Sequence, residues 1–118
     1  MCSLSDQKSV FHGTIKVVTH EWIVETVRNR RYLVSHHADQ ERMNDRLSIR
    51  EVETAILNGR ILESYPDTGR GESVLVAGFA DSGTPIHVVY GKRAEFGAIV
   101  TVYIPGPPKF VGPFQRSD

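Results

Sequence analysis

The segment from Ser48 to Tyr65 constrains the fold most, because the period of its apolar residues changes inside it. Ser48 and Glu51 have the S-x-x-E spacing of a capping box, in which each side chain bonds to the backbone of the other residue. Apolar residues then recur at positions 49, 52, 55 and 56, which is helical spacing. Asn58-Gly59 predicts the end of this helix, and the sequence RILESYP that follows is typical of a strand. The segment therefore predicts a helix followed at once by a strand.

Three more strand-like segments follow along the chain. They read SVLVAGFA, PIHVVYG and AIVTVYIP, and Gly, Asp and Ser residues separate them, including the turn Asp81-Ser82-Gly83. Strands that follow one another in meander order pair with their neighbours in opposite directions. The second half of the chain therefore predicts a four-stranded antiparallel sheet.

The first half predicts two more helices and a short strand. The sequence THEWIVETVRNRR reads as a helix capped by Thr19, and YLVS at 32–35 as a short strand. A second helix is expected from about His36 to Arg46, with Ser35 as its cap. The predicted fold class is α+β: an N-terminal helix, a short strand and two short helices packed on a four- to five-stranded, mainly antiparallel sheet.

The length and composition fit one compact domain. The chain has 118 residues, of which 40% are hydrophobic and 24% are charged. We place a single α+β domain at 19–105, a partly ordered arm at 1–18 with TIKVV as a marginal strand, and a tail rich in Pro and Gly at 106–118. Phe110, Val111 and Phe114 are expected to pin this tail to the surface.

Charge and cysteine content exclude several classes of protein. The 14 basic residues balance the 14 acidic ones, so binding of a nucleic acid would need a local basic patch. No apolar run approaches the roughly 18 residues that span a bilayer, and the start MCSLSDQKSV lacks an apolar leader, so we expect a cytoplasmic protein without membrane contact. Cys2 is the single cysteine, which excludes an internal disulfide and a thiolate metal cluster.

Several motifs together resemble the bacterial family called domain of unknown function 4258. They are His37-Ala38-Asp39 with Glu41-Arg42, AILNGRILESYPD, PIHVV, and TVYIP before a Pro-rich end, and the resemblance covers about residues 20–110. The family's arrangement of helices and strands is similar to that of small RelE-like and BrnT-like toxins. These toxins cleave or interfere with RNA and are neutralised by an antitoxin. The resemblance implies a RelE-like fold, RNA as substrate and an antitoxin as partner, and it leaves a homodimer open.

The polar residues include the types that a metal-free ribonuclease needs. Such an enzyme requires a base for the 2′-hydroxyl, a cation for the phosphorane and an acid for the leaving oxygen. His37, Arg42, Arg46 and His87 supply these types and are the catalytic candidates. Arg42 and Arg46 are four residues apart, so one helix face would present both guanidinium groups to adjacent phosphates.

Two tyrosines complete the candidate site, and a metal site is not expected. Tyr90 and Tyr103, on predicted strands, are candidates to stack on bases or donate a proton. A metal site from His36, His37 and His87 is disfavoured, because adjacent helical residues point about 100° apart and do not converge. We therefore predict neither a metal nor another cofactor.

Structural roles compete with each of these assignments. Arginines flanked by Asp39, Glu41 and Asp45 are typical of a solvated helix face whose charges pair with one another. A histidine after a helix cap is often a structural hydrogen-bonder, and a strand tyrosine often packs in the core with a wet hydroxyl. The alternative to a toxin acting on RNA is a non-enzymatic protein-binding module. Convergence of Arg42, Arg46 and His87 on a concave basic surface would favour the ribonuclease.

Overall fold

A computed structural model describes residues 18–67, 69, 71–106, 110–112 and 115–116. The described chain is α+β, which confirms the predicted fold class. Residues 1–17 of the expected arm and Phe114 lie outside the described residues, as do the side chains of Phe110 and Val111. In chain order the elements are α1 His20–Arg28, β2 Tyr32–Val34, α2 His36–Asn44, α3 Ile49–Asn58, β3 Arg60–Tyr65, β4 Ser73–Phe79, β5 Pro85–Arg93, β6 Phe96–Tyr103, β7 Phe110–Gly112 and β8 Gln115–Arg116.

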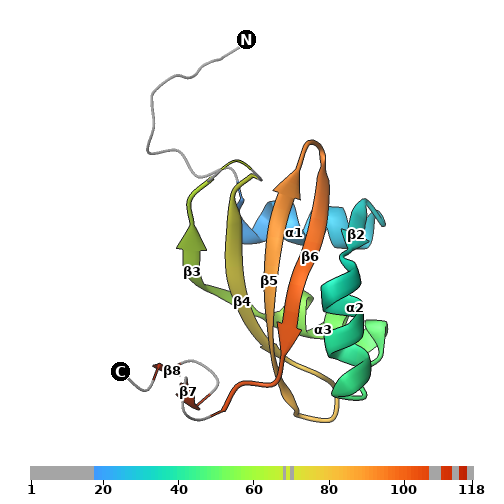
Figure 1. Cartoon of the computed structure of the whole chain (residues 1–118), viewed down its shortest axis with the longest axis vertical. Helices are drawn as coiled ribbons and strands as arrows, with labels where there is room; N and C mark the ends of the chain where they lie inside the picture. Colours follow the sequence, from blue (N-terminus) through green and yellow to red (C-terminus); the bar gives the residue numbers. More distant parts are fainter. Residues whose placement is uncertain (1–17, 68, 70, 107–109, 113–114, 117–118) are drawn as a thin grey trace.

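The main sheet has five strands in the order β2-β6-β5-β4-β3 (Figure 1). The last four strands form the predicted antiparallel meander. The short strand β2 instead runs parallel to β6, with Leu33 opposite Ala98, so the sheet is mixed. Strands β7 and β8 pair separately with each other.

The three helices in the described part of the chain begin at the caps that the sequence predicts. The side chain of Thr19 accepts from the N–H of Trp22, and that of Ser35 accepts from Ala38. Ser48 and Glu51 form the complete capping box, with reciprocal bonds of 3.0 and 2.8 Å. Each bond satisfies an N–H that the first turn of a helix leaves without a partner.

Helices α1 and α2 end in the same way, and α2 ends earlier than predicted. After Asn44 the chain turns through Arg46 at φ 57°, and the N–H of Leu47 bonds to the carbonyl of Arg42 at 2.7 Å. This is a Schellman motif, which closes the last helical turn with a left-handed residue. Arg30 has the same place and the same φ after α1. The prediction that Arg46 lies in the helix is wrong, because the left-handed turn takes it off the helical path.

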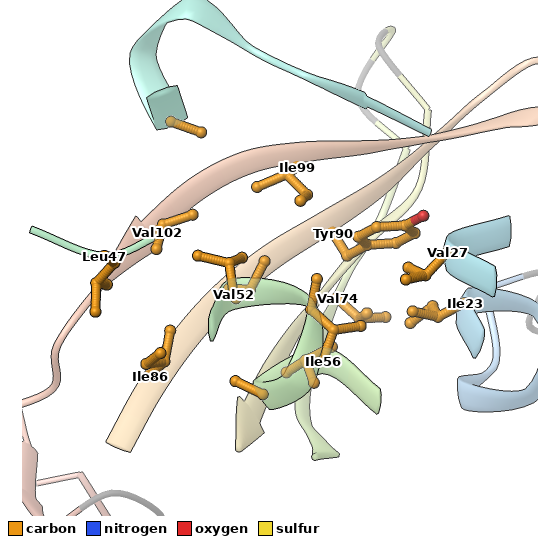
Figure 2. Packing of buried hydrophobic residues seen from close by; sticks show 14 of the residues in the cluster. Ile23, Val27, Leu47, Val52, Ile56, Val74, Ile86, Tyr90, Ile99 and Val102 are labelled. Atoms are coloured by element: carbon orange, nitrogen blue, oxygen red, sulfur yellow. The ribbon is translucent and has the colours of Figure 1, made fainter. Parts of the chain in front are cut away.

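The core lies between α1, α3 and one face of the sheet (Figure 2). The stripe predicted on α3 is buried as expected, and Ile56 has no exposed surface. Gly78 allows α3 to approach the sheet closely, because a Cβ atom there would lie 1.9 Å from the carbonyl oxygen of Ala55. Fully or almost fully buried members of this core include Val18, Ile23, Val52, Ala55, Ile56, Val74, Val76, Ile86, Val88, Tyr90, Ile99 and Val102.

Within the described part of the chain, no helix combines the length and the apolar character needed to cross a bilayer.

Candidate functional site

Helix α2 takes the place of a strand along part of the edge of β6. Strand β2 ends at Val34, and from there polar side chains of the α2 segment bond to the β6 backbone. The hydroxyl of Ser35 donates to the carbonyl of Val100 at 3.0 Å, and the N–H of Val102 donates to Oε1 of Glu41 at 3.0 Å. Ala38, one turn before Glu41, is fully buried. These contacts fix α2 to the sheet.

The guanidinium group of Arg42 is bound within its own segment. Its Nε donates to Oδ1 of Asp39 at 2.8 Å, and Nη1 donates to the carbonyl of Leu47 at 3.1 Å. Only 23% of the side chain is exposed. Leu47 follows the turn at the end of α2, so Arg42 closes that turn. This is the self-paired arrangement that the neighbouring acidic residues had suggested as the alternative to catalysis.

His37 is the catalytic candidate of α2 that faces solvent. Its side chain is 68% exposed, and Nε2 lies 3.2 Å from Oε2 of Glu41, one turn further along. Because the other oxygen of Glu41 already accepts from Val102, this carboxylate joins His37 to the sheet backbone. Arg46, exposed after the end of the helix, does not share a helical face with Arg42.

His87 and Tyr103 lie together on the sheet face that points away from the core. Ile86 and Val88 face the core, so the side chain of His87 points to the opposite face. Its Nδ1 atom is 3.3 Å from the hydroxyl oxygen of Tyr103, and the ring centroids are 5.3 Å apart. His87 is fully buried. In this conformation His87 cannot contribute to an exposed basic surface.

Tyr90 belongs to the core rather than to a surface. The hydroxyl of Thr26 donates to the carbonyl of Ile23 at 2.9 Å, so the hydroxyl of Tyr90 must donate to Thr26 at 2.7 Å. Gly97 makes room for the ring, because a Cβ atom there would lie 2.0 Å from the Tyr90 hydroxyl. Burial raises the pKa of Tyr90 to about 12. A ring in this position cannot stack on a base without local opening of the fold.

The sequence-predicted residues therefore do not present one concave basic surface. His37 is exposed on α2, Arg42 is closed onto its own helix, and Arg46 lies beyond that helix. Among the described residues, no group of three or more His, Cys, Asp or Glu side chains is placed to hold a metal ion.

Comparison with known families finds a match, and it includes the contacts between α2 and β6. A sequence profile described as domain of unknown function (DUF4258) matches residues 34–104, which is more than half of the chain. The chain belongs to the DUF4258 family. The match begins at the last residue of β2 and ends just after β6, so it covers α2, α3 and the meander. No curated protein and no solved structure matches the chain.

The structure gives a physical reason for the residues that carried the DUF4258 resemblance. Ala38 is buried, Asp39 holds Arg42, and Glu41 holds the edge of β6. Arg42 in turn holds the carbonyl of Leu47. In the DUF4258 segment of this chain, the motif after Ser35 therefore docks a helix onto a sheet.

A surface that we did not predict from the sequence lies at the other end of the β6 edge. The bonds from Gly97 to Arg31 and from Ser35 to Ile99 fix which residues of β2 face β6. In a parallel ladder these residues alternate, so the backbone groups of Tyr32 and Val34 point outward. Beside them Leu33 is 61% exposed and Phe96 is 46% exposed. The apolar triplet YLV is the signal in the sequence that could have predicted this surface, because it places apolar side chains on both faces of a short strand.

Proposed function

We propose that this protein is a protein-binding module, and that an extended segment of a partner chain pairs with the outer edge of β2. The observation that carries the proposal is the combination of outward backbone groups at Tyr32 and Val34 with exposed Leu33 and Phe96. Partner strands that add to a sheet edge gain affinity from main-chain hydrogen bonds and specificity from side chains at alternate positions.

The register places the two exposed apolar side chains on one face. Leu33 lies opposite Ala98, and Phe96 is two residues before Ala98 on the neighbouring strand, so both stand on the face away from the core. We define the β2 surface as Tyr32, Leu33, Val34 and Phe96. Exposed sheet edges are commonly protected by charged side chains. Leu33 is instead apolar, which suits contact with an apolar side chain of the partner segment.

The geometry supports this proposal better than it supports a ribonuclease. A catalytic base and a phosphate-binding cation must both reach the same phosphodiester. His87 is buried, and the guanidinium of Arg42 already bonds to Asp39 and Leu47. The resemblance to RelE-like and BrnT-like toxins still implies one class of partner, an antitoxin. In that case the chain arrests growth when it is expressed alone, and co-expression of the antitoxin relieves the arrest.

A proline scan of β2 tests the proposal directly. Val34→Pro removes an outward N–H without removing a bond between β2 and β6, because the N–H of Val34 points away from β6. Val34 also packs against the core, so we expect this variant to melt somewhat below the wild type but well above Leu33→Pro, and to lose co-purification with the protein encoded by the neighbouring gene. Leu33→Pro is the matched control, because it removes an N–H that faces β6 and should destabilise the sheet.

Side-chain variants provide a second readout. Leu33→Lys and Phe96→Lys should weaken the same complex, whereas Met43→Lys, at a residue that is 49% exposed on α2, should leave it unchanged. Sedimentation of the chain alone identifies the case in which the partner is a second copy. Full binding by Val34→Pro and Leu33→Lys would contradict the proposal.

A further inference from the structure

An open groove lies between the turn after α1 and the outer side of α3, and the Tyr32 side chain of the β2 surface borders it through Glu53. Its volume is about 460 Å³, and Arg30, Arg50, Glu53, Thr54 and Leu57 line it. The four residues from α3 follow helical spacing, so they form one face of that helix. Ligand sites for small molecules commonly have volumes of about 300–1,000 Å³. The groove is therefore large enough for a ligand of nucleotide size.

Two guanidinium groups in the groove have no hydrogen-bond or ion-pair partner among the described residues. Arg30 and Arg50 form neither an ion pair nor a side-chain hydrogen bond there, although Arg50 and Glu53 stand one helical turn apart. This differs from Arg31, which bonds to Glu25, and from Arg42, which bonds to Asp39. Guanidinium groups bind phosphate oxygens with two parallel N–H bonds. The groove therefore offers two such forks to an anionic group.

The Glu53 carboxylate beside these arginines accepts a hydrogen bond at one of its two oxygen atoms. The hydroxyl of Tyr32 donates to Oε2 of Glu53, while Oε1 has no hydrogen-bond donor among the described residues. Burial and the bond to Glu53 both raise the pKa of Tyr32, so its hydroxyl stays protonated and remains a donor. The phenol thus fixes the orientation of the carboxylate and leaves Oε1 to accept a hydrogen bond from a ligand.

We propose that this groove binds a ribose phosphate, with the phosphate between Arg30 and Arg50 and the 2-hydroxyl of the ribose donating to Oε1 of Glu53. The hydroxyl of Thr54 adds a polar contact, and Leu57 gives an apolar surface for the sugar or base. The carboxylate of Glu53 disfavours a bare anion, so the ligand must carry a hydrogen-bond donor close to its phosphate. A ribose hydroxyl meets this requirement, and either a free ribonucleotide or one position of an RNA chain supplies it.

Titration calorimetry with a series of ligands tests the chemistry of the groove. The probes are inorganic phosphate, ribose 5-phosphate, 2-deoxyribose 5-phosphate, adenosine monophosphate, and RNA and DNA hexamers of the same sequence. We expect ribose 5-phosphate to bind at least about tenfold more tightly than its deoxy analogue, since one hydrogen bond to a charged group contributes about 1.5–3 kcal/mol. Binding of the monophosphate without the RNA identifies a free nucleotide, and tighter binding of the RNA identifies a chain.

The two Schellman turns provide a matched pair of variants. Arg30→Gly and Arg46→Gly both place glycine at a φ of 57°, so both should keep the fold and raise the melting temperature. Only Arg30 lines the groove, so Arg30→Gly should weaken ribose 5-phosphate at least about tenfold while Arg46→Gly binds like the wild type. Glu53→Gln should strengthen inorganic phosphate and reduce the preference for ribose. Equal losses in the two glycine variants, or equal binding of ribose and deoxyribose phosphates, would overturn the proposal.

Discussion

The α2 segment and the groove between α1 and α3 contain similar residues, but their polar atoms are used differently. In the α2 segment, Asp39, Glu41 and Arg42 all bond to the backbone or to one another. In the groove, Arg30 and Arg50 have no such partner in the described chain. Residue type alone therefore does not separate a scaffold from a site. A better criterion is whether each donor and acceptor already has a partner within the fold.

The largest loss of stability is expected for a substitution on the buried face of α3, opposite the face that lines the groove. Ile56 is fully buried, so Ile56→Ala should reduce the free energy of unfolding by about 2–5 kcal/mol through lost burial and a residual cavity. Thr54→Ala, on the groove side of the same helix, should change it by less than about 0.5 kcal/mol. Chemical denaturation of both variants measures the two values. Similar losses in the two variants would remove the distinction between the faces of α3.

The second effect concerns Tyr90, whose hydroxyl is used within the core. Its pKa is raised to about 12 in the folded chain, whereas an unfolded tyrosine titrates near 10. The stabilising effect is therefore complete below about pH 10, and is lost as the pH rises from about 10 to about 12, by about 3 kcal/mol. Denaturant unfolding across this range should show a steeper fall for the wild type than for Tyr90→Phe. Parallel curves would mean that the hydroxyl is not held in a desolvated site.

The third prediction compares two residues of α2: Arg42, which bonds within the fold, and His37, which faces solvent. Arg42→Ala leaves Asp39 and the carbonyl of Leu47 without their donor, so it should cost about 1.5–3 kcal/mol, or less where solvent reaches the pair. His37→Ala, at a side chain that is 68% exposed, should cost less than about 0.5 kcal/mol. Melting temperatures of the two variants give the comparison. If Arg42→Ala melts like the wild type, the structural assignment of Arg42 fails.

The parts of the fold that depend on nearby residues could be predicted from the sequence. The caps at Thr19, Ser35 and Ser48 act within one helical turn, and the four meander strands are separated by turn residues. The end of α2 could not be predicted, because the left-handed position that glycine usually occupies is filled by Arg46. The parallel pairing of β2 with β6 joins Leu33 to Ala98, and nothing local specifies it.

The candidate site was harder to predict because its decisive contacts are distant in sequence. In the sequence Glu41 reads as a charge that flanks two arginines, yet its partner is the N–H of Val102, 61 residues away. Tyr32 was assigned only to a strand, and its bond to Glu53 becomes visible when α3 lies beside β2. Residue types and spacing predict which chemistry is available. They do not predict which groups the fold has already satisfied.

The position of β6 in the chain has a consequence for the order of folding during synthesis. It is the last strand of the main sheet to be translated, yet β2 and α2 both bind along its edge. Until β6 leaves the ribosome, the pairing of β2 and the edge contacts of α2 have no surface to complete them. Contacts between such distant segments slow folding, because a long loop must close before they form. We therefore expect β2 and α2 to dock on the sheet only after the last strand of the meander has been synthesised.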